Sequence, residues 1–253
     1  MFEKLERRIV VKYKIKTISD LHIGIGAPTV PNSVDLPVIK NAEGIPIIPG
    51  SSLKGVLRAE MQKLLNTQFG DSEIKVDDKE VKKADVHVAE LFGGEIVDNN
   101  KLRSVAGSIR VRDAKTESKK TRIRDGVKID INTRKAAGGA KFEIEVVPAG
   151  TVFNGEIYIE NPGLGKNGEY KYGKLGALLS TIRFFNATTR AIGGGTSRGF
   201  GEVEIEVEKV KEFRPEHYLN GKIEGEDVGE DRQKKAIEEW KNYVLGEVKK
   251  DGV

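Results

Sequence analysis

The chain alternates in a fixed order between segments with a period of two and segments with a helical period. From Ile9 to Ile18 apolar residues alternate with lysines, which predicts a half-buried strand. Between Leu53 and Leu65 the apolar residues recur on one face, which predicts a helix. Further strands are expected at 108–113, 142–146, 152–159 and from 203 onward, and a second helix at about 174–188. This order strongly limits the folds that the chain can adopt.

The order is strand, helix, strand, then an insertion, then strand, strand, helix, strand. It predicts an α+β protein with a ferredoxin-like (RRM-like) βαββαβ core and helices on one face of the sheet. Proteins that bind RNA on a sheet face use the same topology. We expect one core over residues 1–213, with insertions at about 66–106 and 113–147. Residues 214–253 are predicted to form a linker and a C-terminal amphipathic helix.

Composition excludes several kinds of site. The 253 residues contain no cysteine, which excludes disulfides, thiolate zinc sites and a cysteine nucleophile. The three histidines are not at ligand spacing, so a histidine-rich metal site is not expected. No apolar run approaches the roughly 18 residues of a membrane-spanning helix. The first residues are charged and include no apolar signal segment, so we expect a cytoplasmic protein.

The stretch from Ile48 to Arg58 has the pattern of a helix start that binds phosphate. A Pro-Gly pair precedes Ser51 and Ser52, either of which is a suitable N-cap. Lys54 and Arg58 are four residues apart and share one helix face. The free N–H groups of a helix N-terminus, together with cations, favour an anion. The alternative is a capped helix whose cations are solvated.

A second candidate segment is the glycine-rich stretch 193–201, between the later helix and the last core strand. Gly194 and Gly195 permit close approach of the backbone to a ligand, and Arg198 can pair with phosphate. The alternative is a mobile loop. The lysines and arginines of 115–141 similarly suit either a nucleic-acid backbone or a solvated loop.

Two single residues complete the candidates. Asp35 lies between apolar residues and just before Leu36-Pro37, where it is either a functional carboxylate or a turn-capping aspartate. His22 follows the first strand and either contacts RNA or is a hydrogen-bonded histidine at a strand end.

Together these segments resemble the RAMP (repeat-associated mysterious protein) superfamily of CRISPR effector complexes, and most closely the backbone subunit of the type III-A (Csm) complex. The likeness spans about residues 9–210. Four stretches carry it, in the order 21–24, 34–58, 91–113 and 193–201. Leu36 stands where the family often has serine, and the tail beyond about 214 has no clear counterpart in the family.

The resemblance implies a homo-oligomeric filament along a guide RNA, assembled with other CRISPR effector subunits. Target RNA would be cut at regular intervals with a divalent cation such as magnesium. Asp35 would be the catalytic residue, with no fixed metal site beyond Asp35 and a substrate phosphate. A thumb-like hairpin within 113–147 would distort the guide–target duplex. The residues implied to contact RNA are His22, Ser51, Ser52, Lys54, Arg58, Asn132, Arg134, Gly194, Gly195 and Arg198.

Three other functions are consistent with parts of the sequence. A non-catalytic guide-RNA scaffold would have the basic segments but no need for Asp35. A metal-independent guide-processing endoribonuclease would need a histidine general base, for which His22 is the candidate. A small-molecule enzyme on a ferredoxin-like fold would need an apolar pocket with convergent titratable groups, and the sequence indicates none.

Overall fold

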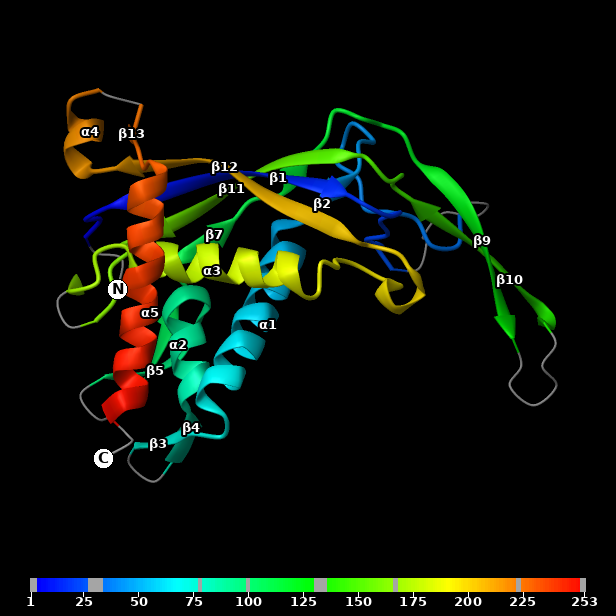
Figure 1. Ribbon diagram of the computed structural model, residues 1–253. Helices are drawn as coiled ribbons and strands as arrows, with labels where there is room; N and C mark the ends of the chain where they lie inside the picture. Colours follow the sequence, from blue (N-terminus) through cyan, green and yellow to red (C-terminus); the bar gives the residue numbers. More distant parts are fainter. Residues whose placement is uncertain are drawn as a thin grey trace.

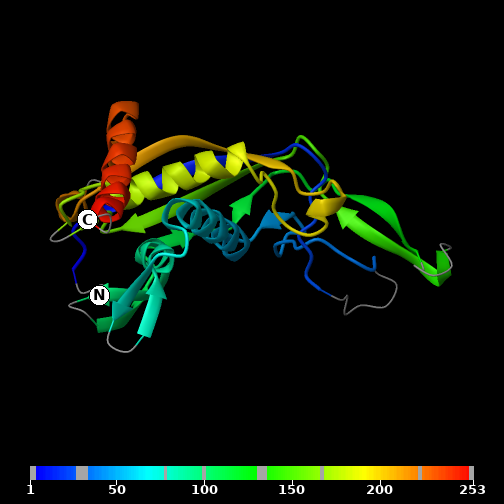
Figure 2. The ribbon, with the colours of Figure 1, turned by 60° about the horizontal axis from the view of Figure 1, so that its bottom comes forward.

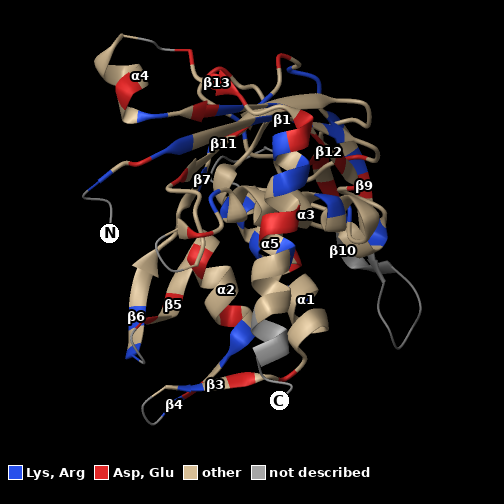
Figure 3. Cartoon of the chain, turned by 60° about the vertical axis from the view of Figure 1, so that its left-hand side comes forward, with Lys and Arg blue, Asp and Glu red and all other residues tan. Residues whose placement is uncertain are grey.

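The structure is a computed structural model that describes residues 4–26, 34–76, 79–98, 101–129, 136–165, 168–221 and 224–250. It is a mixed α+β protein built on one antiparallel sheet, and the helices α1, α2, α3 and α5 lie together on one face of that sheet (Figures 1 and 3). The predicted α+β class is therefore confirmed.

The centre of the sheet is β1 (Arg8–Thr17), whose lysines alternate with buried residues. β1 pairs with β11 (Val152–Glu160) on one side and with β12 (Val203–Phe213) on the other. Four shorter strands complete the sheet: β2 (Ile47–Ile48), β7 (Ile109–Val111), β8 (Ala114–Lys115) and β13 (Glu226–Asp227). β7 and β8 pair with β11, β2 pairs with β8, and β13 pairs with β12. The strands β12, β1, β11 and β7 thus lie side by side in that order.

The helices are α1 (Gly50–Phe69), α2 (Lys83–Phe92), α3 (Gly173–Ala187), α4 (Pro215–Leu219) and α5 (Glu230–Lys250). The apolar side chains of β1, including Ile9, Val11 and Ile15, are fully buried against this layer. The C-terminal helix α5 belongs to the same packing unit, because Trp240 and Val244 are buried in the common core. At Gly176 of α3 an added Cβ would lie 2.0 Å from the carbonyl oxygen of Ala236, so the two helices are in backbone contact.

The start of α1 corrects one expectation. The helix begins at Gly50, so Pro49 occupies the N-cap position and neither Ser51 nor Ser52 is the cap. The N–H of Gly50 donates instead to Oδ1 of Asp113, at 2.8 Å. Gly50 is needed here because a Cβ would lie 2.1 Å from the carbonyl oxygen of Val111. The close approach of α1 to β7 brings a carboxylate from another segment to the helix start.

The first insertion is more ordered than its weak pattern indicates. It contains the hairpin of β3 (Glu73–Val76) and β4 (Lys79–Lys82), then α2, then the hairpin of β5 (Gly93–Asp98) and β6 (Lys101–Ala106). Helix α2 was not predicted. Most of its side chains are buried, so it lacks the polar face that produces a helical stripe in the sequence.

The second insertion forms a long hairpin of β9 (Arg122–Ile129) and β10 (Ala136–Val146). The hairpin projects from the end of the sheet that lies away from α5 (Figures 1 and 2). It occupies the segment in which the thumb-like hairpin was expected. Asn132 and Arg134, expected at its tip, lie outside the described residues.

Candidate nucleic-acid interface

Three segments that are distant in sequence meet at the base of the β9–β10 hairpin. The N–H of Leu36 donates to the carbonyl of Glu143 (3.0 Å), and the N–H of Glu145 donates to the carbonyl of Leu36 (2.9 Å). The segment around Leu36 is therefore paired in parallel with β10. Leu21 and Val147 exchange two backbone hydrogen bonds of 2.9 and 2.8 Å, which attach the end of β1 to the same hairpin. We call the junction of Leu21, Leu36 and residues 143–147 the hairpin base.

Asp35 lies on the exposed edge of this pairing. Its Oδ2 accepts a hydrogen bond from the backbone N–H of Glu143, at 2.8 Å, and the side chain is exposed. The carboxylate is thus held in place on one side and remains accessible to solvent. The N–H that Asp35 accepts from lies 108 residues away, so this hydrogen bond is not the cap of a local turn.

Glu145 is buried at the hairpin base and hydrogen-bonds to the segments around it. Its carboxylate accepts hydrogen bonds from Lys40 Nζ (2.5 Å), Thr121 Oγ1 (2.7 Å) and the N–H of Val38 (3.1 Å). Burial by itself disfavours the charged form, but these hydrogen bonds outweigh it and lower the pKa of Glu145. Glu145 therefore joins the segment that carries Asp35 to both strands of the hairpin. Sequence reasoning missed this residue, because its partners are brought together only by the pairing.

His22 connects the hairpin to the glycine-rich loop. Its Nδ1 lies 2.8 Å from the carbonyl oxygen of Glu145, so Nδ1 carries the proton and donates it. The carbonyl oxygen of His22 accepts the N–H of Gly194, at 2.8 Å. Gly193 has φ of 89°, and a Cβ there would lie 2.3 Å from that same oxygen. The close approach of this loop to the end of β1 therefore requires glycine.

The loop continues into the short 3-10 helix η2 (Thr196–Arg198). Gly195 before it and Gly199 after it both have left-handed backbone conformations, with φ of 73° and 85°. Arg198 is exposed. His22, Asp35, Gly194, Gly195 and Arg198 thus belong to segments that hydrogen bonds join at the hairpin base.

The candidates on α1 form a separate group. Ser51 is exposed and Ser52 is half-buried. Lys54 Nζ lies 3.4 Å from the carbonyl oxygen of Ile109, and Arg58 Nη1 donates to the carbonyl of Gly93 at 3.0 Å. Burial, together with the neighbouring Arg58 charge, lowers the pKa of Lys54. The side chains of Lys54 and Arg58 contact β7 and the start of β5, rather than the hairpin base.

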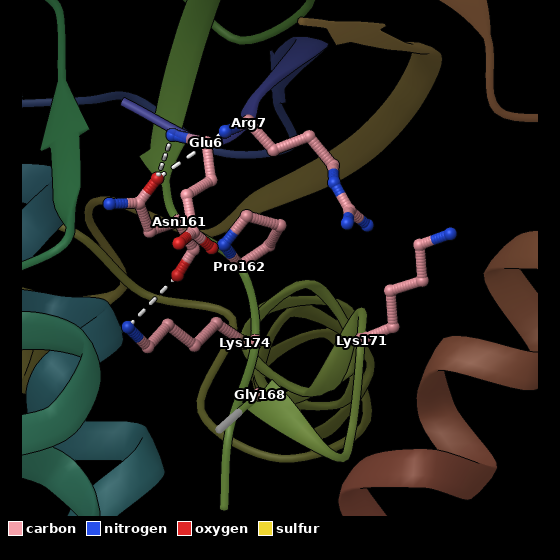
Figure 4. A pocket seen from close by; sticks show the side chains of 8 residues that line it. Glu6, Arg7, Asn161, Pro162, Gly168, Lys171 and Lys174 are labelled. Carbon is pink, nitrogen blue, oxygen red and sulfur yellow. Dashed lines mark hydrogen bonds between the residues drawn. The ribbon is translucent and has the colours of Figure 1, made fainter. Parts of the chain in front are cut away.

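A pocket lined by cations lies where α3 begins, apart from the hairpin base and from the α1 candidates (Figure 4). Lys174 Nζ donates to Ser108 Oγ (2.9 Å) and to the carbonyl of Asn161 (3.0 Å), and burial lowers its pKa. The guanidinium of Arg7 lies 5.5 Å from the ring centre of Tyr172 and pairs with a buried glutamate. The third cation, Lys171, has its Nζ 5.7 Å from the ring centre of Tyr172. All three cations of this pocket thus have partners within the protein, so we do not include it in the candidate interface.

Within the described residues, no group of three or more cysteine, histidine, aspartate or glutamate side chains is arranged to hold a metal ion. Nor does any helix found there combine the length and apolar character needed to cross a bilayer.

Comparison with known proteins agrees with this architecture. The family model of the RAMP superfamily matches residues 14–204. The chain is 30% identical over 216 residues to "CRISPR system Cms endoribonuclease Csm3" of Streptococcus thermophilus, which covers 79% of this chain and 87% of that protein. It is 26% identical over 216 residues to the protein of the same name from Mycobacterium tuberculosis, with 78% and 86% covered. The resemblance inferred from the sequence is confirmed, and the chain belongs to the RAMP superfamily.

Proposed function

We propose that the chain is a guide-RNA-binding backbone subunit of a type III-A CRISPR effector complex and that it cleaves complementary target RNA. The names of the two Csm3 relatives support the reaction class. The observation that carries the proposal is the exposed Asp35 carboxylate, fixed by the N–H of Glu143 at the base of a projecting hairpin. We also propose that the β12-β1-β11-β7 order represents a ferredoxin-like core.

The guide strand would lie along His22 and the loop of Gly194, Gly195 and Arg198, with further contacts on α1 from Ser51, Ser52, Lys54 and Arg58. The hairpin would distort the paired target so that a 2′-hydroxyl lines up with its adjacent phosphate. The 2′-oxygen then attacks phosphorus while the bond to the 5′-oxygen breaks, which leaves a 2′,3′-cyclic phosphate on one fragment, and the departing 5′-oxygen takes a proton from water. Asp35 accepts the proton of the 2′-hydroxyl or orients that group, and most of the rate gain comes from the enforced geometry.

We propose a divalent cation, magnesium, as the cofactor of cleavage. The chemistry of the site fits only a weakly held ion, because Asp35 is a single carboxylate and magnesium accepts one or two carboxylates together with waters and phosphate oxygens. When bound, the ion would offset charge on the phosphate. Several copies would assemble along one guide with other effector subunits in the cytoplasm.

The test is cleavage of labelled complementary RNA by the complex reconstituted with guide RNA, with magnesium or with EDTA. Asp35→Asn is expected to lower the cleavage rate by about 100-fold, the usual loss for a general base. The Kd for guide RNA should change by no more than about twofold, which corresponds to about 0.4 kcal/mol. Asp125→Asn, another exposed aspartate on the hairpin, is the matched control and should cleave normally. Undiminished cutting by Asp35→Asn would refute the assignment.

One observation favours a second candidate, the metal-independent guide-processing endoribonuclease. Because Nδ1 of His22 donates to a carbonyl, Nε2 of the neutral ring is an acceptor and suits a general base. Processing of a guide precursor in EDTA, lost in His22→Ala, would support this candidate. A wild-type complex that binds guide and target but leaves both intact would support the non-catalytic scaffold.

A further inference from the structure

The hairpin base contains a small pocket with three arginines from two different segments. Arg122 and Arg124 come from β9, and Arg198 comes from the glycine-rich loop. Between the two β9 arginines lies the carboxylate of Asp20, which is only 4% exposed. The remaining lining residues are Ser19, Ala149, Gly199 and Phe200.

Asp20 fixes the orientation of both β9 arginines. Its Oδ2 accepts from Nε of Arg122 (3.1 Å) and from Nε of Arg124 (2.7 Å), and the Nη2 atoms of both guanidinium groups also contact its carboxylate. Each guanidinium therefore uses one edge for Asp20, which leaves Nη1 outside this pairing. The guanidinium of Arg124 additionally lies 6.0 Å from the ring centre of Phe200.

The charge of this cluster is unbalanced. Burial disfavours ionisation of Asp20, but the hydrogen bonds from Arg122 and Arg124 lower its pKa, so it is ionised at neutral pH. One negative charge then faces three positive charges. Arg198 forms no ion pair in the part of the chain that the structure describes, and the side chains of Arg122 and Arg124 are 49% and 51% exposed. The excess positive charge is thus accessible to a ligand.

We propose that Asp20, Arg122, Arg124 and Arg198 form a phosphate-binding pocket that grips a phosphodiester of bound RNA at the hairpin base. Planar guanidinium groups that are already oriented lose little entropy when they bind phosphate oxygens. Left-handed glycines stand on both sides of η2, and Arg198 of this turn lines the same pocket as the β9 arginines. Asp20 is a positioning residue, because it acts on the RNA through Arg122 and Arg124.

The pocket and Asp35 lie at two edges of one strand. β10 pairs with β9, which carries Arg122 and Arg124, on one edge and with the Leu36 segment, which carries Asp35, on the other. A phosphodiester fixed at the pocket would therefore set the position of the RNA relative to Asp35. This inference rests on the proposed function, since it names the group by which the RNA is held.

The test measures binding of a fluorescent guide RNA with a 5′-hydroxyl end by anisotropy, over a series of salt concentrations. Arg122→Gln combined with Arg124→Gln and Arg198→Gln should weaken binding about tenfold. For a single strand, each lost phosphate contact lowers the slope of log K against log salt by about 0.7. The control replaces three other arginines by glutamine: Arg103, Arg110 and Arg232, which pair with carboxylates away from the pocket. The control removes the same charge and should keep the wild-type slope.

A second arm replaces chloride by inorganic phosphate at equal ionic strength. Phosphate should compete with RNA in the wild type but not in the pocket variant. Equal competition in both, or a salt slope of the pocket variant equal to that of the control, would overturn the proposal. Failure of wild-type protein to bind RNA at all would instead refute the proposed function, so the two failures are distinguishable. Circular dichroism of each variant confirms that the fold is kept.

Discussion

We call the face of the sheet opposite the helices α1, α2, α3 and α5 the open face. The open face and the hairpin base both carry cations and carboxylates, but the ratio of positive to negative charge differs between them. On the open face, Lys14 pairs with Glu208, and Lys12 lies 3.5 Å from Glu156. Lys16 lies opposite Glu204 in the register of β1 and β12. Each lysine of β1 thus has an acidic neighbour on an adjacent strand. In the pocket at the hairpin base, three arginines line one space with a single carboxylate, Asp20, and only two of them pair with it.

The difference teaches that topology alone does not indicate which surface of this fold to propose for RNA binding. Proteins that bind RNA on a sheet face stack bases on exposed aromatic rings. Here the guanidinium of Arg112 lies 4.9 Å from the ring centre of Tyr158, and the hydroxyl of Tyr158 donates to Glu156 at 2.6 Å. This aromatic group is already engaged within the protein. The excess positive charge lies in the pocket at the hairpin base instead.

The largest effect is expected from Gly193→Ala, which acts on the hairpin base alone. The methyl group would meet the His22 carbonyl oxygen at 2.3 Å in a backbone with φ of 89°, so the loop must move away from β1. We expect RNA affinity to fall by tenfold or more and stability by about 3 kcal/mol, the upper end for a strained position.

Gly44→Ala is the matched control for this prediction. Gly44 also has a left-handed backbone, with φ of 75°, but it does not line the pocket and an added Cβ meets nothing within 4 Å. It should cost about 1 kcal/mol from the left-handed backbone alone. Chemical denaturation and anisotropy measure both quantities. Equal losses in the two variants would show that contact with His22 does not matter.

A smaller effect is expected from Asp20→Asn. Loss of one partner of a buried ion pair costs about 3–5 kcal/mol, but Arg122 and Arg124 are half-exposed, so we expect about 2 kcal/mol. Glu208→Gln removes a carboxylate from the exposed sheet face and should leave the melting temperature nearly unchanged. Thermal unfolding of both variants at neutral pH compares the two regions directly.

The stability difference for Asp20→Asn should also depend on pH. The folded-state pKa of Asp20 is lowered, so its contribution is fully present above the unfolded value of about 3.9. It should disappear as the pH falls further, through the folded-state pKa. A difference between wild type and variant that grows on acidification would contradict this assignment.

The strands and helices with strong periods could be predicted from the sequence. The segments expected at 9–18, 152–159 and 174–188 match β1, β11 and α3 closely, because each has one buried face and one polar face. Helix α2 was missed because it is buried on most sides. The serine cap of α1 was predicted wrongly, because the cap is supplied by Asp113 from a distant segment.

The candidate site was only partly predictable for the same reason. Asp35, His22 and the glycine-rich loop were each recognisable from local sequence and from the family resemblance. Their proximity depends on the pairing of β10 with segments more than 100 residues away. Asp20 has no local signal, because its role depends on Arg122 and Arg124, which are 102 and 104 residues further along.

The smallest effect is expected on the open sheet face. Replacing Lys12, Lys14 and Lys16 together by glutamine removes three positive charges, the same number as the hairpin-base variant. Because acidic neighbours already offset these lysines, we expect less than a twofold change in RNA affinity, below about 0.4 kcal/mol by the relation of free energy to Kd. The salt slope should also stay at the wild-type value, since no phosphate contact is lost. A slope that falls as far as in the hairpin-base variant would mean that RNA covers both surfaces. The local balance of charge would then not be what selects the RNA-binding surface of this fold.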